Sequence, residues 1–582
     1  MGRAVVTLAL ALLAVLVVLP VLTMAVQSVR VDVVETTGGD RFLGQVRDTD
    51  LEGVTIRVHG ETTSRWVARA DVAREARTFS LVNYRSLFGG GKRNMLLATL
   101  ALAGASALVA LLIGLPLGLL LAATDLPGRR FIEPLSVLPL VLPPILFAIA
   151  TYHDLLRVPG PGFLRAAYVF GLTLFPLVSL FVARAVRATG ADALDAARVQ
   201  TTPLDALLKV ALGPALPGAA TGALLVFVFV VADFAVPDFL GVTTAKNTIT
   251  VYANAVFRYW TDTDVGMATA AGMPPTLCAL AAFAVVLFVE AKRDAATLGG
   301  SFRTLEPLPL GRARIPCLLL AIGVLVVALV WPAARHLETA GGAHFGKPVA
   351  LTGVTTTIDE SREKPVSVMD GLRKGLRADR VGESTLNSLV LAGGGALLAV
   401  FCALLLSEAG RGRPRLDRLL LVLAFLPVAV PAMSLAVGWV TFWGPSRASL
   451  RFFPILLLAA RLLPFAAFAV RAARRRVAPE LLEAAAVAGL PPGARLARIT
   501  LPLITPGIAL GLLLAFLFGL REVDALVFTR TGSETLPVQL YGLIHYGHDV
   551  QVGALSFLWT AAVALLLLVL ALLTGSRFRL LP

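Results

Sequence analysis

Apolar runs of roughly 20 residues recur along the whole chain, and this recurrence limits the possible folds more than any other feature. A run of that length allows a helix to cross the ~30 Å hydrocarbon layer of a membrane. The composition agrees, because 57% of the 582 residues are hydrophobic and only 15% are charged, against about 45–50% and 25% in soluble proteins. We therefore predict an all-α polytopic membrane protein with about twelve transmembrane helices. The predicted spans lie at about residues 4–27, 94–124, 131–152, 165–187, 215–240, 267–291, 313–333, 387–408, 417–441, 451–472, 504–524 and 552–575.

The first apolar run could be a secretory signal peptide, with Arg3 as its basic start. Its apolar core exceeds the usual ~7–15 residues, however, and no clear A-x-A cleavage site follows it. We expect it to be retained as a transmembrane helix.

The positive charge of the chain is distributed in a way that predicts its orientation. The 52 Lys and Arg residues exceed the 37 Asp and Glu residues, which gives a net charge of +15, and the basic clusters fall in alternate loops. This alternation is typical of the positive-inside rule and predicts that both termini are cytoplasmic. The basic patches are expected to contact anionic membrane lipid and not nucleic acid. The predicted cytoplasmic loops include 194–214 and 481–502, and the predicted extracytoplasmic loops are 28–93, 241–266, 334–386 and 525–551.

The sequence lacks the patterns of a catalytic or metal site. Cys278, Cys317 and Cys402 lie in or beside predicted spans without C-x-x-C spacing, which indicates neither a disulfide framework nor a zinc site. The six histidines form no metal-spaced cluster, and no Ser–His–Asp set is evident. The stretch GGAHFGKP at 341–348 nearly matches a phosphate-binding loop, but Pro348 replaces the hydroxyl residue that would hold magnesium. We expect no cofactor, no resident metal and no catalytic residue.

The chain contains an internal repeat with an offset of 288 residues. LPLVLPPI at 138–145 corresponds to LPVAVPAM at 426–433, and LDAARVQ at 194–200 corresponds to LEAAAVA at 482–488. Because an even number of spans, about six, separates equivalent points, the two halves share one orientation and are related by an axis along the membrane normal. We predict two homologous six-helix halves with pseudo-twofold symmetry.

A polar segment at 30–78 interrupts this pattern. Its short β-type runs at Phe42–Val46, Val54–Val58 and Arg65–Ala68 are separated by turns that contain Gly and Asp. We predict a small β-rich extracytoplasmic insert, which is either a spacer on the outer face or a docking element. The predicted division is a first transmembrane helix (1–29), the insert (30–78), a first helical core (79–312) with a cytoplasmic loop at 189–214, a seventh helix with an extracytoplasmic loop (313–386), and a second helical core (387–582) with a cytoplasmic loop at 473–502.

The cytoplasmic loop of the second half contains the sequence EAAAVAGLPPGARLARITLP at 483–502. Pro491, Pro492 and Gly493 interrupt a helix, because proline lacks the amide donor and restrains the residue before it. Two short helices at an angle are therefore predicted. The small residues at 484–486 and Gly489 would permit close backbone approach, and an acidic residue near a helix start is favoured by the helix dipole. The alternative is an ordinary amphipathic helix on the lipid headgroups.

This stretch resembles the cytoplasmic signature of permeases of type I, binding-protein-dependent ABC importers. The first half has Thr201 in place of the glycine, and Ala211 and Gly213 in place of the isoleucine and leucine, which leaves open whether the two loops make equal contacts. The matching residues in the second half are Glu483, Ala484, Ala485, Gly489, Ile499, Leu501 and Pro502, and the first half retains Asp195, Ala196, Ala197 and Pro214.

The resemblance implies a permease of the bacterial inner membrane that moves a substrate, delivered by a periplasmic binding protein, into the cytoplasm. It also implies two cytoplasmic ABC ATPase subunits as partners, each with a groove that accepts the second short helix of one loop. The pattern D-F-x-x-P-x-x-L-G at 233–241 and the stretch REVDALVF at 521–528 are similar to the fused permeases of the ferric iron importer family. Fused thiamine and aminoethylphosphonate permeases share much of this pattern. The resemblance favours ferric iron as substrate, with thiamine, aminoethylphosphonate or polyamine as alternatives.

Charged residues at equivalent places near the outer ends of two spans are candidates for the transport pathway. Asp233 and Glu522 align to within one residue of the repeat offset, and charges at membrane depth are functional candidates because they are costly. One hypothesis is that both face a central cavity between the halves and shape cation passage or gating. The alternative is an interfacial salt bridge, for example of Arg521 with a neighbouring carboxylate. The prolines of the repeat are predicted to kink their spans, either as hinges or as static bends; they are Pro139, Pro143, Pro144, Pro427 and Pro431.

Two other classes of protein remain open at this point. An ion-driven secondary transporter could also be a two-half bundle, and it would need ion ligands on broken helices at the membrane midplane. A membrane scaffold or sensor would use the segment at 30–78 as its ligand-binding part. Copurification with ATPase subunits would separate the importer from both.

Overall fold

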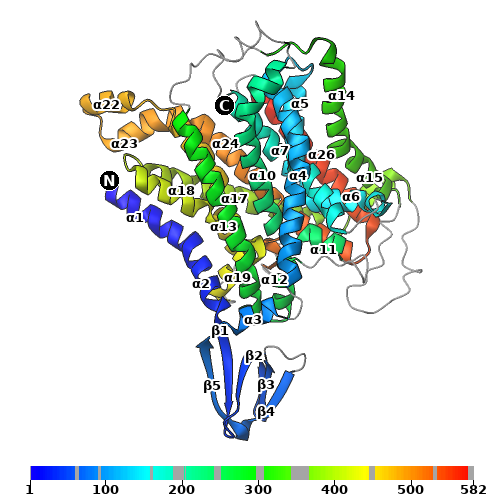
Figure 1. Cartoon of the computed structure of the whole chain (residues 1–582), viewed down its shortest axis with the longest axis vertical. Helices are drawn as coiled ribbons and strands as arrows, with labels where there is room; N and C mark the ends of the chain where they lie inside the picture. The colour runs from blue at the N-terminus through cyan, green and yellow to red at the C-terminus, as the bar shows by residue number, and fades with distance from the viewer. Residues whose placement is uncertain are drawn as a thin grey trace.

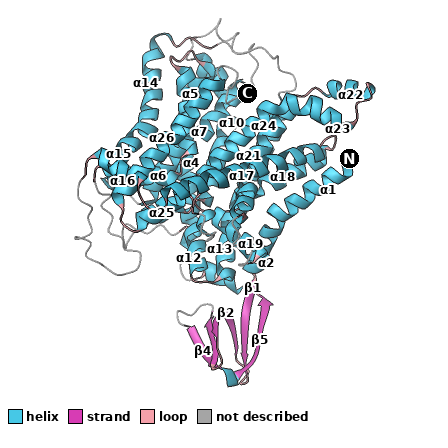
Figure 2. Ribbon diagram, turned by 180° about the vertical axis from the view of Figure 1, so that it is seen from behind, coloured by secondary structure: helices cyan, strands magenta, loops and turns pink. Residues whose placement is uncertain are grey.

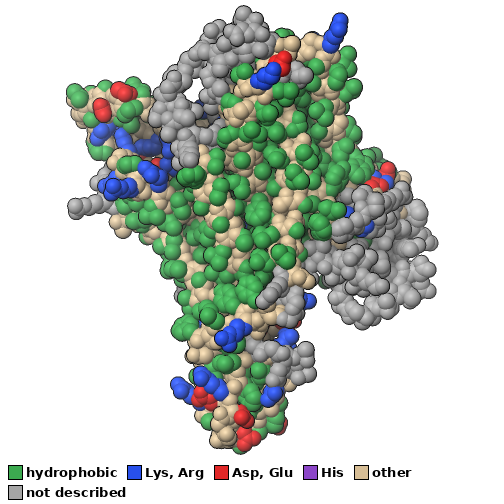
Figure 3. All heavy atoms as spheres, in the orientation of Figure 1, with side chains coloured by type: hydrophobic (Ala, Val, Ile, Leu, Met, Phe, Trp, Pro, Cys, Tyr) green, Lys and Arg blue, Asp and Glu red, His purple; other side chains and the backbone are tan. Residues whose placement is uncertain are grey.

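The protein consists of a helical bundle with a small β-sheet that projects from one end (Figure 1). Within its described residues, this computed structural model contains ten helices that are long and apolar enough to cross a membrane, or up to twelve if two sharply bent helix pairs each count as a span. Figure 3 shows a largely hydrophobic middle zone on the visible face, with charged side chains gathered toward the two ends. The predicted all-α polytopic membrane fold is confirmed. The described residues are 2–58, 64–89, 93–157, 162–187, 202, 205–241, 251–296, 307–342, 366–444, 452–528 and 534–574.

The first half contains the sheet and the helices before residue 297. Its elements are α1 (Gly2–Leu13), a π-helical turn (Ala14–Val18), α2 (Leu19–Ser28), β1 (Arg30–Thr36), β2 (Arg41–Thr49), β3 (Gly53–Val58), β4 (Ser64–Ala68), β5 (Val72–Phe79), α3 (Val82–Phe88), α4 (Arg93–Ala123), α5 (Arg129–Val141), α6 (Pro144–Arg157), α7 (Gly162–Arg187), a π-helical turn (Ala206–Ala211), α10 (Leu212–Ala232), α11 (Ala235–Gly241), α12 (Tyr252–Thr261) and α13 (Val265–Ala296).

The second half repeats this order without a sheet. Its elements are α14 (Arg314–Leu325), a π-helical turn (Val326–Val330), α15 (Trp331–Ala340), α16 (Val368–Leu376), α17 (Val381–Ala409), α18 (Pro414–Ala429), α19 (Ala432–Trp443), α21 (Phe453–Arg474), α22 (Pro479–Val487), α23 (Pro492–Arg495), a π-helical turn (Leu496–Thr500), α24 (Leu501–Leu520), a 3-10 turn (Leu526–Phe528), α25 (Leu536–His545) and α26 (Asp549–Thr574).

The two halves pack in a reciprocal manner. Helices α4, α7 and α10 contact one another in the first half, as α17, α21 and α24 do in the second. The opening span of each half crosses to the other half, because α2 packs against α19 and α15 packs against α6. Equivalent helices therefore make equivalent contacts, which confirms two homologous halves with pseudo-twofold symmetry.

Two predicted spans are broken near their middle. Helices α5 and α6 meet at 89°, and α18 and α19 meet at 104°. The breaks fall at Leu142 and Val430, which are extended and directly precede Pro143 and Pro431. Proline lacks an N–H group and disfavours the helical conformation in the residue before it. The prediction of continuous helices at 131–152 and 417–441 is therefore wrong, and these prolines break the helices instead of kinking them.

The spans predicted at 215–240 and 504–524 also end early. Helix α10 ends at Ala232, Asp233 is extended, and α11 begins at Ala235. In the second half, α24 ends at Leu520. The acidic residues near these ends are thus in non-helical backbone just beyond a helix, where their carboxylates can accept hydrogen bonds from free amides.

The segment between α2 and α3 folds into an antiparallel sheet with strand order β4-β3-β2-β1-β5. Val34, Val54 and Ile56 form its small core. The sequence predicted β2, β3 and β4 but missed β1 and β5. Most residues of β5 are exposed, and its charged residues are Arg74, Glu75 and Arg77. The sheet lies at the end of the bundle opposite α22 and α23 (Figure 2).

The sheet is held to the turn between α12 and α13. The Gln45 side-chain amide donates to the Thr263 carbonyl at 2.6 Å, and Arg57 pairs with Asp262 at 3.5 Å. Thr263 has a positive φ of 60°, which is unusual for a β-branched residue. The insert therefore contacts the first half at the turn between α12 and α13. The predicted boundaries of the domains stay a prediction.

The loop predicted at 334–386 contains ordered helix. Helix α15 continues to Ala340, and α16 packs closely against it. A Cβ atom added at Gly371 would lie 1.8 Å from the Ala340 carbonyl oxygen, so only glycine fits at this contact. The near-match to a phosphate-binding loop lies mostly outside the described residues.

Candidate functional site

The internal repeat marks two candidate functional regions. The first is the segment 479–502, here called the coupling segment. It consists of α22, α23 and the π-helical turn that enters α24. Figure 1 shows α22 and α23 projecting from the bundle at the end far from the sheet. Helix α22 is the first of the two predicted short helices. The second is not separate, because α23 continues through the π-helical turn into α24 as one helix, Pro492–Leu520.

A glycine-based cap ends α22. The Gly489 N–H donates to the Ala486 carbonyl and the Leu490 N–H to the Ala485 carbonyl, both at 3.0 Å. These two bonds form a Schellman motif, which requires a left-handed residue after the helix. Gly489 has that conformation, with φ of 79°, and the following Pro491 prevents the helix from continuing.

The structure gives a reason for glycine at this position that the sequence did not. A Cβ atom added at Gly489 would meet no atom within 4 Å, so close backbone approach inside this chain does not explain it. The positive φ explains it, because side chains with a Cβ are strained in this region. Close approach to another chain stays a prediction.

The coupling segment presents an open surface. Val487 is 90% exposed and Leu481 is 51% exposed, although large apolar side chains are usually covered. Among the residues predicted from the signature, Glu483, Ala484 and Pro502 are also exposed, Ile499 and Leu501 are half-buried, and Ala485 is buried. Such a surface is suited to contact with a partner.

The corresponding loop of the first half falls largely outside the described residues, including Asp195, Ala196 and Ala197. Pro214 is described and lies in the first turn of α10. Both halves enter this third core helix through a π-helical turn, at Ala206–Ala211 and at Leu496–Thr500. Just before the first of these turns, hydrogen bonds from Lys209 and Thr202 lower the pKa of Asp205.

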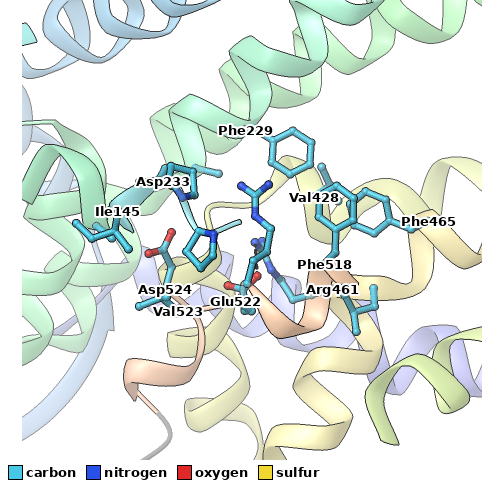
Figure 4. A pocket seen from close by; sticks show the side chains of 16 residues that line it. Ile145, Phe229, Asp233, Val428, Arg461, Phe465, Phe518, Glu522, Val523 and Asp524 are labelled. Carbon is cyan, nitrogen blue, oxygen red and sulfur yellow. Dashed lines mark hydrogen bonds and ion pairs between the residues drawn. The ribbon is translucent and has the colours of Figure 1, made fainter. Parts of the chain in front are cut away.

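The second region is a pocket between the halves, here called the central pocket. Its walls include residues just after the break between α5 and α6, Val428 just before the break between α18 and α19, and the residues after the ends of α10 and α24. Phe229 and Phe518 occupy equivalent positions in the two halves, and their rings lie 6.0 Å apart in a stacked arrangement. Phe465 stacks on Phe518 at 4.0 Å. Figure 4 shows these three rings on one side of the pocket and Asp233 and Asp524 on the other.

Asp233 and Glu522 hold equivalent backbone turns. The Asp233 carboxylate accepts from the Val236 N–H at 3.2 Å, and the Glu522 carboxylate accepts from the Ala525 N–H at 3.1 Å. Each bond spans three residues and caps a turn that follows a core helix. The structure thus brings the two sequence-predicted pathway residues into one pocket.

A third carboxylate joins the halves. Asp524 accepts a hydrogen bond from the Phe234 N–H of the first half at 3.3 Å. Beyond the pocket, Tyr541 of the second half donates to Asp238 of the first at 2.7 Å. The interface around the pocket is therefore polar as well as aromatic.

Two arginines complete the central pocket. Arg461 pairs with Glu522 at 3.2 Å and donates to the carbonyls of Pro427 and Val430 at 3.2 and 3.4 Å. Arg521 donates to the Leu140 carbonyl of the first half. The guanidinium of Arg521 also lies over the ring of Phe518, 5.3 Å from its centroid.

The sequence interpretation missed Arg461. It lies inside the apolar run LLLAARLLPF, where a charge at membrane depth is itself a signal. A salt bridge, the alternative that the sequence left open, is present here. It joins Glu522 to Arg461 and not to Arg521. In the described part of the chain, no group of three or more His, Cys, Asp or Glu side chains is placed to hold a metal ion.

Comparison with known families agrees with this architecture. Residues 114–292 and 395–580 each match the model of the binding-protein-dependent transport system inner membrane component. Together the two matches cover more than half of the chain. The chain belongs to this family. Each match contains one break and one loop of the repeat, whereas the β-sheet and α16 lie outside both.

Several curated relatives match part of the chain. The phosphate transport system permease protein PstA 2 of Mycobacterium bovis is 31% identical over 198 residues, which are 32% of this chain and 60% of the relative. The putative 2-aminoethylphosphonate transport system permease protein PhnV of Salmonella paratyphi A is 26% identical over 176 residues, 30% of this chain and 65% of the relative. The Fe(3+)-transport system permease protein FbpB 2 of Haemophilus influenzae is 32% identical over 173 residues, 29% of this chain and 34% of the relative. The chain thus spans less than two thirds of the length of each of these relatives.

Proposed function

We propose that this chain is the transmembrane permease subunit of an ABC importer in a bacterial inner membrane. A periplasmic binding protein delivers the substrate, and two separate cytoplasmic ATPase subunits supply the energy. The chain itself forms the path through the membrane and does not hydrolyse ATP.

The coupling segment is the observation that carries this proposal. Helix α22, which ends in the glycine cap, projects from the bundle (Figure 1), and α23 leads directly into α24, which lines the central pocket with Phe518. A partner that moves α22 would therefore move the second half's wall of the pocket. The signature residues of the loop and the match of both halves to one permease family support the same function.

Copurification tests the proposal. Purified from its native membrane, the chain is expected to bring down two copies of an ATPase subunit, and its reconstitution with them should give ATPase activity stimulated by a substrate-loaded binding protein. An ion-driven transporter or a scaffold would purify without such subunits, and uptake driven by an ion gradient alone would reject the proposal.

The proposed orientation places both termini and the coupling segment in the cytoplasm, with the sheet outside. Leu51 is 98% exposed in the sheet and Val487 is 90% exposed in α22. In a cysteine-free background, Leu51→Cys should react with a membrane-impermeant maleimide in intact spheroplasts, and Val487→Cys should react only after permeabilisation. The opposite result would reverse the topology.

Ferric iron is the first substrate that we propose, on the resemblance of the segments at 233–241 and 521–528 and on one relative named for Fe(3+) transport. The central pocket contains three acidic side chains and two arginines, and carboxyl groups are suited to contact a cation. Phosphate and aminoethylphosphonate are the second candidates, because two other relatives carry those names and the pocket arginines could contact an oxyanion. Uptake of labelled ferric iron and of labelled phosphate, compared in one vesicle preparation with the partner binding protein, would decide between them.

Asp233 and Glu522 are proposed to shape passage through the central pocket. Asp233→Asn and Glu522→Gln should each lower uptake at equal expression, because each removes a charge from the pocket wall. Wild-type uptake in both variants would remove these residues from the pathway.

A further inference from the structure

Both arginines of the central pocket come from the second half. By the repeat offset of 288, Thr173 stands in α7 where Arg461 stands in α21. Arg521 corresponds to Asp233 at this offset, and to Ala232 if the alignment is shifted by the one residue that pairs Asp233 with Glu522. The Thr173 hydroxyl donates to the Val169 carbonyl of its own helix at 2.9 Å. The first half therefore has no cation at either matching position.

Each of the two arginines donates a hydrogen bond to a carbonyl that a proline leaves without its helical N–H partner, one in each half. In an α-helix each carbonyl accepts from the N–H four residues later. Pro144 and Pro431 have no N–H, so the carbonyls of Leu140 and Pro427 lose this partner at the two breaks. Arg521 donates to Leu140, and Arg461 donates to Pro427.

The two arginines differ in whether they contact the helix break of their own half or that of the other half. Arg461 lies in α21 and supports the break between α18 and α19 of its own half. Arg521 crosses the interface to support the break between α5 and α6 of the other half. Its guanidinium lies over the ring of Phe518, one turn earlier in α24, at 5.3 Å, and over the ring of Phe229 of the first half at 5.9 Å. The nearer of these two ring contacts would stay with the second half if the halves separated.

We propose that Arg521 is a positioning residue that holds the first half's broken helix to the second half, a contact here called the latch. The two helix breaks then behave differently when the central pocket opens. This inference rests on the proposed transport function, in which the halves separate around the central pocket. On separation the Leu140 carbonyl loses its donor, and the break between α5 and α6 becomes free to change. The break between α18 and α19 keeps Arg461 and moves as one unit with its own half.

Two equivalent residues report on the two breaks. Ile145 and Met433 are the second residues of α6 and α19, they match at the repeat offset, and they are 2% and 0% exposed. Ile145→Cys and Met433→Cys would be made singly in a chain whose three cysteines, Cys278, Cys317 and Cys402, are replaced by serine or alanine. The rate of alkylation by a small thiol reagent then measures how often each break opens.

The latch predicts a selective effect. With Arg521→Ala, Ile145→Cys should react at least about tenfold faster, because a buried carbonyl loses its partner, and Met433→Cys should change less than about twofold. With Arg461→Ala, Met433→Cys should be the accelerated position. Equal acceleration at both positions, or none at Ile145→Cys in Arg521→Ala, would overturn the proposal.

Lysine substitutions separate this role from a merely structural one. Arg521→Lys keeps one cationic donor for one carbonyl and should restore slow alkylation of Ile145→Cys. Arg461→Lys should not restore Met433→Cys, because a single ammonium cannot reproduce the fork that reaches two carbonyls and Glu522. If Arg521→Ala gives no monodisperse elution peak and so does not fold, Arg521→Met replaces it under the same criterion, because methionine keeps the side-chain length without an N–H donor.

Labelling needs only the full chain reconstituted in vesicles, without ATPase subunits. The latch can therefore fail while copurification with an ATPase succeeds, or the reverse, and the two results remain distinguishable.

Discussion

The cap at Gly489 allows a quantitative prediction about the coupling segment. The residue has φ of 79°, and a Cβ atom there would contact nothing within 4 Å. Gly489→Ala therefore adds backbone strain without a clash, and a left-handed residue with a Cβ costs about 1–2 kcal/mol. Gly489→Asn should cost less, because asparagine tolerates this conformation better than alanine.

If the capped turn is the form that binds the ATPase, this strain appears as lost affinity. A cost of 1–2 kcal/mol corresponds to roughly a 5- to 30-fold rise in Kd for Gly489→Ala. Binding of the purified ATPase subunit to nanodisc-embedded protein measures this directly. Gly489→Arg adds bulk and charge at the same place, and we expect it to abolish transport and ATPase coupling while the membrane fold stays intact.

Two outcomes would refute the reasoning. Unchanged affinity of Gly489→Ala would show that the left-handed turn is not part of the bound form. Alternatively, Gly489→Asn could bind more weakly than Gly489→Ala, which would show that space and not backbone conformation limits the contact. Normal coupling in Gly489→Arg would count against the function as a whole.

Further predictions concern stability. Arg461→Met removes the ion-pair partner of Glu522 and the donor to two carbonyls, and it should lower the free energy of unfolding by about 3–5 kcal/mol. Arg461→Met combined with Glu522→Gln should lower it less, because no unpaired charge is left. Thermal unfolding in detergent measures both variants, and equal losses would contradict the pairing. Gly371→Ala should release α16, because its Cβ would lie 1.8 Å from the Ala340 carbonyl, at a cost of about 1–3 kcal/mol. Gly393→Ala is its control, since a Cβ there meets nothing within 4 Å, and hydrogen exchange of residues 368–376 should rise only in the first variant.

The membrane fold could be predicted from the sequence because each of its signals is local and the signals recur many times along the chain. Length and hydropathy of each span suffice to place a transmembrane helix, and the repeat of prolines and small residues at one offset revealed two halves. The positions of Asp233 and Glu522 in one pocket also followed from the repeat, since a twofold axis brings equivalent residues together.

Other features depended on geometry that hydropathy does not contain. Pro143 and Pro431 were expected to kink their helices, but whether a proline kinks or breaks a helix depends on which group satisfies the carbonyls it leaves free. Those groups are Arg521 and Arg461, and contact between residues so distant in sequence cannot be inferred from one chain. Strand β5 was missed because its charged residues are exposed and no alternation of apolar residues marks it. Strand β1 does alternate, with Val31 and Val33 buried between the partly exposed Arg30 and Asp32, so the sequence contained a signal for this strand.

Site-specific crosslinking from α22 tests the central claim most directly. A photo-reactive amino acid in place of Val487, which is 90% exposed, would be incorporated into the full chain in its native membrane. The account predicts one major adduct, with an ATPase subunit, whose yield changes when ATP is bound. An adduct with a periplasmic protein or with lipid, and none with an ATPase subunit, would contradict it.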